Sequence, residues 1–180
     1  ISVLANQNLN YLISGNSPHQ MGNAHMNIAP YEVVPVSDGH IILAVGNDGQ
    51  FQRFCKVTGL DDMAANPDFA TNAARVTNRR PLRERIIATT SQWTRDDLLA
   101  ELEKALVPAS PINSIADAFA DPQTIARGMK LDLADGFGTQ LPSVRSPMIM
   151  SETPLTYERP SPRLGQHTEE ILAELKRSET

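Results

Sequence analysis

The segment spanning residues 31–59 constrains the fold most, because it changes from a strand pattern to a helix pattern within a few residues. Apolar residues alternate in "YEVVPVSDGHIILAVG", where the central "SDG" offers the turn of a hairpin. Pro35 cannot donate a ladder hydrogen bond, so its strand should lie at an edge of the sheet. Asn47 or Asp48 can then cap a helix that ends at Gly59. The segment therefore predicts an antiparallel hairpin followed directly by a helix.

The rest of the chain lacks the regular strand–helix–strand alternation of a parallel sheet. Apolar residues recur at helical spacing up to Gly15, a residue type that commonly ends helices. Residues 130–133 alternate like a strand, and glycines mark the turn that follows. Thr94 should cap a helix whose buried stripe is Leu98, Leu99, Leu102 and Leu106. Further helices are predicted at about 81–93, 114–121, 121–129 and 167–176. Together these signals predict an α+β fold with short antiparallel strands and several helices.

Two features suggest how the chain is divided. The first helix has no N-terminal capping signal, and its helical spacing of apolar residues is already under way at Ile1. We therefore expect a piece of a longer protein. The stretch 153–164 is rich in proline, which keeps a connector extended. We therefore expect a helix of another domain in 1–15, a small α+β domain in 16–152, and a connector with a final helix in 153–180.

Charge and cysteine content exclude several classes of protein. The chain has 16 basic and 21 acidic residues and a net charge of −5, and its arginines at 79–85 are spaced like the wet face of a helix, so no nucleic-acid partner is predicted. The longest apolar run is far too short for a bilayer, and no secretory signal is visible, so we expect no membrane partner. A single cysteine, Cys55, allows no internal disulfide, which fits the cytoplasm. Cys55 lies on an apolar stripe and is predicted to be a packed thiol.

Polar residues gather on both sides of the hairpin. Gly22, Asn23, His25 and Asn27 precede it, and they are the candidates for a ligand-binding loop. His25 could contact a carboxylate or transfer a proton, but its setting favours a loop histidine that hydrogen-bonds the backbone. The cluster after the hairpin, residues 46–48, is explained by helix capping alone.

Several other kinds of site are not supported by the sequence. Arg75 and Asn78 could serve a site, but structural roles are favoured, with the arginine bound to a carboxylate or carbonyl and the asparagine as a cap. No His-x-x-x-His helix or Cys/His cluster supports a metal site, and no nucleotide-binding loop is present.

A set of segments in a particular order carries a family resemblance. They are "LANQNLNYLISG", "GNAHMNIAPY", "DGHIILAVGNDGQFQRFC", "FATNAARVTNR", "PASPIN", "DPQTIARGM" and "RLGQHTEEIL". Together they resemble the class III coenzyme A-transferases over nearly the whole chain. The resemblance implies a homodimer of interlocked subunits, each with a large doubly wound α/β domain and a small α+β domain. In that arrangement this chain would supply the small domain and a C-terminal segment that returns to the large one.

The resemblance also implies a mechanism. Members move CoA between carboxylic acids through an aspartyl-CoA intermediate, with the acyl-CoA thioester as substrate and no tightly bound cofactor. The catalytic aspartate would lie just upstream of Ile1, so no catalytic residue is expected in this chain and none is assigned to CoA binding. "GNAHMNIAPY" corresponds to a loop that is glycine-rich and mobile in some members, whereas here His25 and Asn27 suggest a stiffer wall. That version looks more like members acting on short dicarboxylic or branched acids. An acyl-CoA racemase and a non-catalytic interaction module remain alternatives.

Overall fold

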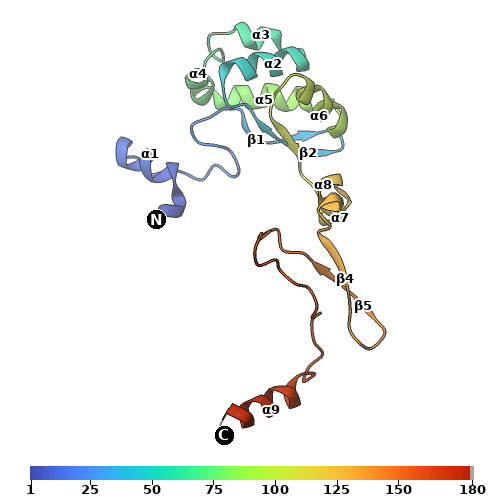
Figure 1. Cartoon of the computed structure of the whole chain (residues 1–180). Helices are drawn as coiled ribbons and strands as arrows, with labels where there is room; N and C mark the ends of the chain where they lie inside the picture. Colours follow the sequence, from blue (N-terminus) through green and yellow to red (C-terminus); the bar gives the residue numbers. More distant parts are fainter. Residues whose placement is uncertain (179–180) are drawn as a thin grey trace. The chain divides into compact units, whose positions relative to one another are not determined.

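The computed structural model describes residues 1–178 and divides into two compact units, residues 1–112 and residues from 113 onward. Each unit is described by itself. Figure 1 shows the first unit in blue to yellow-green and the second in yellow to red. Helices and short antiparallel strands are mixed in both units, which confirms the predicted α+β class.

The first unit contains a three-stranded sheet and most of the helices. Its elements are η1 (Ser2–Leu4), α1 (Asn6–Ser14), β1 (Tyr31–Val36), β2 (Gly39–Ala44), α2 (Asp48–Thr58), α3 (Asp61–Ala65), α4 (Asn72–Thr77), α5 (Arg79–Thr90), α6 (Arg95–Lys104) and β3 (Ala109–Pro111). The strand order is β1-β2-β3 with antiparallel pairing throughout. The predicted hairpin is confirmed. Pro35 lies in β1, at the edge of the sheet, opposite His40.

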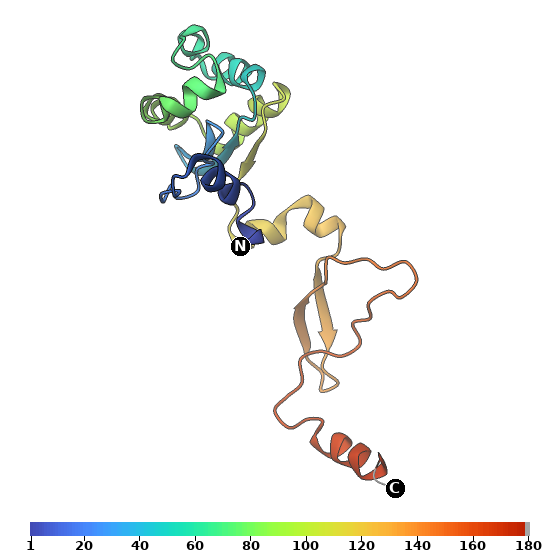
Figure 2. The same ribbon diagram turned by 90° about the vertical axis from the view of Figure 1, so that its left-hand side faces the viewer.

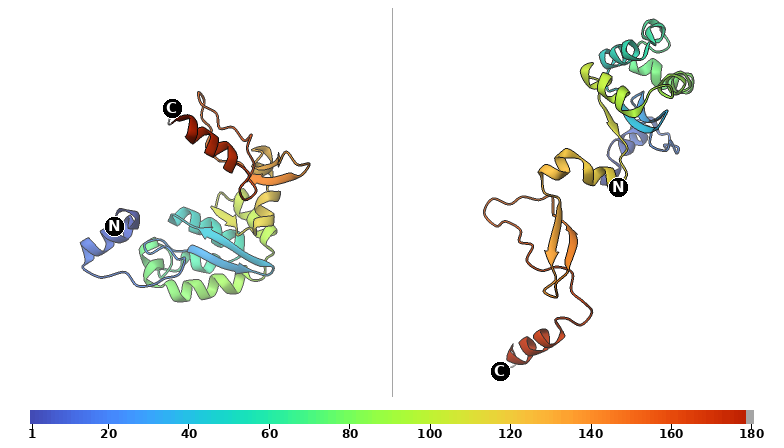
Figure 3. Two further views of the ribbon diagram at one scale, coloured as in Figure 1. Left: turned by 90° about the horizontal axis from the view of Figure 1, so that it is seen from below. Right: turned by 90° about the vertical axis from the view of Figure 1, so that its right-hand side faces the viewer.

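One face of the hairpin forms the floor of the core. Val34, Val36, Ile41, Leu43 and Val45 are buried along that face, in the alternation that a pleated strand produces. The helices α2, α5 and α6 lie over this side of the sheet (Figure 2), and the view from below places the strands in front of them (Figure 3). The sheet is therefore covered on one face by helices.

Local capping signals explain where α2 begins and ends. The Asn47 side chain accepts a hydrogen bond from the Gln50 amide at 2.9 Å, and the Gln50 side chain accepts one from the Gly46 amide at 2.6 Å. Gly59 closes the helix at φ 73°, a left-handed conformation that suits glycine. The predicted cap and stop of this helix are confirmed.

Leu106 contradicts the predicted buried stripe of α6. Leu98 and Leu102 are fully buried, but the helix ends at Lys104 and Leu106 is 76% exposed. Its backbone has φ 54°, and Val107 follows as a buried residue. The helix ends two residues before the last leucine of the predicted stripe.

The arginines of α5 correct a second prediction, because they do not form a uniform wet face. Arg80 is exposed and pairs with Glu84, one turn further along the helix. Arg83 instead binds the buried Glu32 carboxylate at 2.7 Å, and Arg79 is partly buried against the loop before the hairpin. The helix also begins at Arg79 rather than at Pro81.

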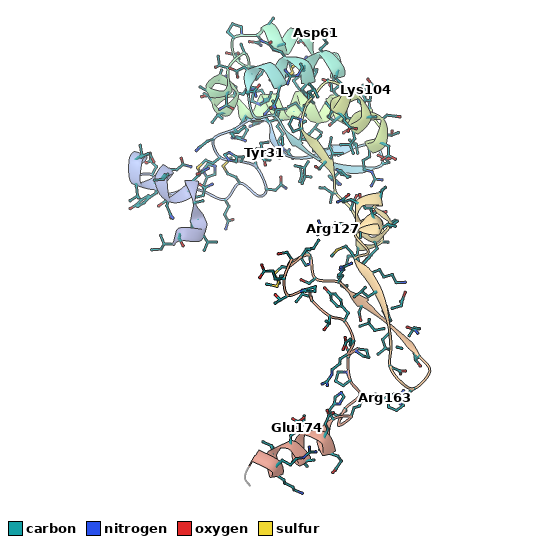
Figure 4. All side chains as sticks on the ribbon, in the orientation of Figure 1. Tyr31, Asp61, Lys104, Arg127, Arg163 and Glu174 are labelled. Atoms are coloured by element: carbon teal, nitrogen blue, oxygen red, sulfur yellow. The ribbon has the colours of Figure 1, made fainter. Side chains whose placement is uncertain are left out.

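The second unit has no buried side chain among residues 113–177. Its elements are α7 (Ile115–Ala120), α8 (Pro122–Ala126), β4 (Lys130–Ala134), β5 (Gln140–Val144) and α9 (Thr168–Ser178). The two short helices and the antiparallel pair of β4 and β5 were predicted, and the structure shows that the side chains of Ser114 and Asp121 cap the helices. Arg163 of the connector (labelled in Figure 4) lies 4.1 Å from the centroid of the Phe137 ring at the hairpin turn. The predicted boundaries at residues 15 and 152 concern the domains of a longer protein and stay a prediction.

The first helix, α1, has no buried residue. It ends at Gly15 in the left-handed conformation, as predicted, and its apolar side chains Leu9, Leu12 and Ile13 are exposed. None of the helices within residues 1–178 is long and apolar enough to cross a membrane.

Cys55 is fully buried in the core, which confirms the predicted packed thiol. Burial, followed by the nearby Asp61 carboxylate, raises the pKa of the thiol from 9.0 to about 12. We expect Cys55 to resist Ellman's reagent at pH 8 in the native protein and to react once urea unfolds it. Native-state labelling at the rate of an exposed thiol would contradict this packing.

The same raised pKa predicts a pH dependence of stability. Between about pH 9 and pH 12 the unfolded thiol ionises while the folded one stays neutral, so the stability present below pH 9 falls as the pH rises. The decline should be shallower in a Cys55→Ala variant when the free energy of unfolding is measured across this range.

Candidate functional site

The candidate loop runs from Gly15 to Pro30 and leads into β1, which begins at Tyr31 (labelled in Figure 4). Gly22 has φ 63°, so an L side chain would be strained there. The Asn23 side chain accepts a hydrogen bond from the Val33 amide at 2.8 Å, and the His25 amide donates to the Tyr31 carbonyl at 2.9 Å. These two contacts satisfy groups on the outer edge of β1, which would otherwise be open to pairing with another strand.

His25 is held in one orientation by two contacts. Its Nδ1 accepts a hydrogen bond from the Asn27 amide at 3.1 Å, and its ring stacks on Tyr31 with centroids 5.4 Å apart. Because Nδ1 is the acceptor, the neutral ring carries its proton on Nε2 and keeps one N–H donor in reserve. The predicted backbone hydrogen bond is confirmed, and the predicted contact with a ligand carboxylate stays a prediction.

Asn27 joins the loop to helices on both sides of it. Its Nδ2 donates to the Asn10 side-chain oxygen at 2.9 Å, which connects the loop to α1. Its carbonyl accepts from the Asn72 side chain at 2.8 Å, which connects the loop to α4. The four predicted residues thus lie within one loop, but three of their side-chain polar groups are already hydrogen-bonded within the protein, namely Asn23 Oδ1, His25 Nδ1 and Asn27 Nδ2.

Arg75 links the end of the candidate loop to the polar cluster that follows the hairpin. This fully buried side chain donates to the carbonyls of Ala29 at 2.6 Å and Phe69 at 2.9 Å, and to the Asp48 carboxylate at 2.8 Å. Its guanidinium also lies 4.4 Å from the centroid of the Phe51 ring. The favoured structural role of Arg75 is confirmed. Asn78 precedes α5, but its side chain binds the Asp68 carbonyl instead of capping that helix.

Two residues that were not identified from the sequence are Arg79 and Asn72, whose side chains hydrogen-bond to the backbone of the candidate loop. Arg79 donates to the carbonyls of His25 at 2.8 Å and Met26 at 2.9 Å. Asn72 holds both Asn27, as described, and the Ala29 amide at 3.1 Å. Asn72, Arg75 and Arg79 are spaced by three and four residues, the spacing of one helix face, and that was the available signal.

The loop is not a closed pocket by itself. Two open hollows, each of about 590 Å³, lie along α6 and its neighbours, and neither is lined by the candidate loop. Within residues 1–178, no group of three or more histidine, cysteine, aspartate or glutamate side chains could hold a metal ion. The loop offers backbone and amide groups and one imidazole N–H, which suit recognition of a carboxylate more than catalysis of a reaction.

Comparison with known proteins provides the family. The chain is 56% identical over 175 residues to the succinate–glutarate CoA-transferase of Agrobacterium fabrum. The aligned region covers 97% of this chain and 44% of that protein. It is 32% identical to the human succinyl-CoA:glutarate CoA-transferase, over 98% of this chain and 40% of that protein. The crystal structure of a CAIB/BAIF family protein from Brucella suis matches with a TM-score of 0.82 and 52% identity, over 97% of this chain and 45% of that one.

The chain therefore spans less than half the length of the relatives it matches. The sequence model of CoA-transferase family III matches residues 1–168. Three observations point to the same family: the order of motifs from the first helix to the last, the mixed α+β fold, and the similarity over almost the whole chain. This chain belongs to CoA-transferase family III.

Proposed function

We propose that this chain is part of an enzyme that transfers CoA between short dicarboxylic acids, with succinyl-CoA as a donor and glutarate as an acceptor. The observation that carries the proposal is the 56% identity, over 97% of the chain, to a succinate–glutarate CoA-transferase. An acyl-CoA thioester and a free carboxylic acid are then the two substrates, and the proposed enzyme needs no tightly bound cofactor.

The proposed chemistry uses an aspartate in the part of the relatives' length that this chain does not span. Its carboxylate attacks the thioester carbonyl, which forms a mixed anhydride and releases the CoA thiolate. The thiolate then attacks the aspartyl carbonyl, giving aspartyl-CoA and the free donor acid. The acceptor carboxylate reverses these two steps and leaves as a new thioester, with the aspartate regenerated. No residue of this chain is assigned as a catalytic group.

The role proposed for the present chain is to line one side of the acyl site and to exclude water from it. A mixed anhydride hydrolyses if water reaches it, and hydrolysis would waste the thioester. Gly22 and Asn23 shape the loop, and the Nε2–H of His25, with Asn27 beside it, is proposed to bind the remote carboxylate of a dicarboxylic acid. A donor N–H fixed in place by Tyr31 and Asn27 supports this assignment.

The proposed assembly follows the family resemblance. Residues 1–15 would belong to the large domain, residues 16–152 to the small domain, and residues 153–180 to a segment returning to the large domain. Two subunits would interlock as a homodimer in the cytoplasm.

Acceptor dependence tests this function in the full-length protein. With succinyl-CoA and glutarate we expect glutaryl-CoA and succinate in equal amounts, and no thioester product when the acceptor is left out. Exchange of the proton next to a thioester carbonyl, with no dependence on an acceptor acid, would instead indicate the racemase alternative. Absence of both activities would contradict the proposal.

His25→Ala tests the proposed carboxylate contact. Removing a hydrogen bond to a charged group should lower kcat/KM for glutarate by about tenfold or more, mainly through KM. His40→Ala is the matched control, because His40 is an exposed histidine on β2 of the same hairpin, and it should leave kcat/KM unchanged. Equal kinetics for the two variants would remove His25 from the site.

A further inference from the structure

We propose that Arg79 is a positioning residue that holds the candidate loop as a rigid wall by binding its backbone carbonyls. The holding itself is argued from the geometry alone. Its consequence for catalysis, exclusion of water from the acyl intermediate, rests on the proposed function.

The guanidinium of Arg79 serves three carbonyls within four residues. Its Nη2 donates to His25 at 2.8 Å, to Met26 at 2.9 Å and to Ile28 at 3.5 Å, and its Nη1 also lies 3.5 Å from the Ile28 carbonyl. The planar guanidinium carries five N–H donors in a fixed fork, so it can hold several acceptors at once without moving. A lysine ammonium on a flexible stem could not reproduce this arrangement.

The neighbouring side chains complete the pattern. Asn72 binds the carbonyl of Asn27, and Arg75 binds the carbonyl of Ala29. From residue 25 to residue 29, every carbonyl therefore accepts a hydrogen bond from a side chain of the α4 and α5 segment. The next carbonyl, that of Pro30, accepts from the Val45 amide of the hairpin.

This arrangement explains how a segment without regular secondary structure keeps a defined shape. Residues 25–29 form neither helix nor strand, so their carbonyls have no ladder partners and would need water or side chains instead. The donors to these carbonyls are side chains that lie some fifty residues later in the chain. Arg79, for example, binds the carbonyl of His25, which precedes it by 54 residues. The loop is thus pre-organised by its support, which is the condition for placing a polar group accurately in a site.

The same support links α5 to the imidazole of His25. Arg79 holds the carbonyl of His25, and the Asn27 amide holds the Nδ1 atom of the same residue. A loop released from Arg79 would lose the geometry that aims the Nε2–H and would open a path for water. Arg79 touches no reacting atom in this account, and it acts only through the loop.

Hydrogen–deuterium exchange of the full-length protein tests the holding directly. The amides of His25, Asn27 and Ala29 each donate to a protein acceptor, so they should be protected in the wild type. In Arg79→Lys we expect their exchange to become roughly tenfold to a hundredfold faster, with core amides of β2 unchanged. The matched control is Arg80→Lys, since Arg80 is the next residue, is exposed, and pairs with Glu84 at the surface of the helix.

The consequence for catalysis has a separate readout. In Arg79→Lys the ratio of succinyl-CoA hydrolysis to CoA transfer should rise about tenfold, with a higher KM for the acceptor, while Arg80→Lys keeps the wild-type ratio. If Arg79→Lys fails to fold, Asn72→Ala provides a milder release of the loop at residues 27 and 29, and the same two measurements apply to it.

The outcomes separate this proposal from the proposed function. Unchanged loop exchange in Arg79→Lys overturns the positioning role, whatever the activity. Faster exchange with an unchanged ratio in an active enzyme overturns the water-excluding wall. If the wild type shows no CoA transfer, the proposed function fails, and faster loop exchange in Arg79→Lys still supports the holding by Arg79.

Discussion

Replacing Arg75 with methionine is expected to lower the free energy of unfolding of the first unit by about 3–5 kcal/mol. Methionine fills part of the volume but donates no hydrogen bond, so the carbonyls of Ala29 and Phe69 lose their buried donor. The cation–π contact with Phe51 is lost as well. The Asp48 carboxylate is half exposed and can turn to water, so the loss comes mainly from the two carbonyls.

The measurement is urea unfolding of the full-length protein, followed by hydrogen exchange in peptides from α2, because a global transition need not be two-state in a larger protein. Arg80→Met is the control, as it removes an exposed arginine that pairs with the exposed Glu84, and it should change stability by no more than about 0.5 kcal/mol. Similar unfolding midpoints for the two variants would show that the buried arginine contributes no more than a surface one.

A matched pair of leucines provides the second large effect. Leu102→Ala should cost about 2–5 kcal/mol, because the side chain is fully buried between α6 and the sheet and its removal leaves a cavity. Leu106→Ala should cost almost nothing, because that side chain is 76% exposed. Both leucines belong to the apolar stripe predicted from the sequence. If the two variants lost the same free energy of unfolding, Leu106 would be as buried as the sequence predicts, and the structure would be contradicted.

A third variant refines this pair. Leu106 has φ 54°, where a side chain with a β-carbon is strained by roughly 1–2 kcal/mol and glycine is not. Leu106→Gly should therefore be at least as stable as the wild type in the same unfolding experiment. A loss comparable to that of Leu102→Ala would mean that the Leu106 side chain packs against something.

Much of the first unit could be predicted from short-range signals. The hairpin follows from the alternation on both sides of residues 37–39, and α2 follows from Asn47 and Gly59. In the second unit the two short helices that follow Ser114 and Asp121 were also predicted correctly. Each of these signals acts over a few residues, through backbone geometry or one side-chain hydrogen bond, so it can be read without knowledge of the fold.

The candidate site was predicted only in part. The sequence pointed to Gly22, Asn23, His25 and Asn27 as a group, and the structure places them in one loop. Their individual contacts were not predictable, because Asn23 binds a strand amide ten residues away and Asn27 binds side chains of two separate helices. Those partners depend on which elements pack together.

By itself the sequence determined the class of fold, the hairpin and most of the longer helices, the packed state of Cys55 and membership of a CoA-transferase family. Only the tertiary structure decided that Leu106 leaves the core and that Arg79 supports the loop. Apolar residues can keep helical spacing beyond the end of a helix, so the spacing does not show where the helix ends. An arginine in a helical segment has the same sequence pattern whether its side chain contacts water or backbone carbonyls. The difference arises from groups brought together across about fifty residues, where the buried carbonyls of an irregular loop must find donors.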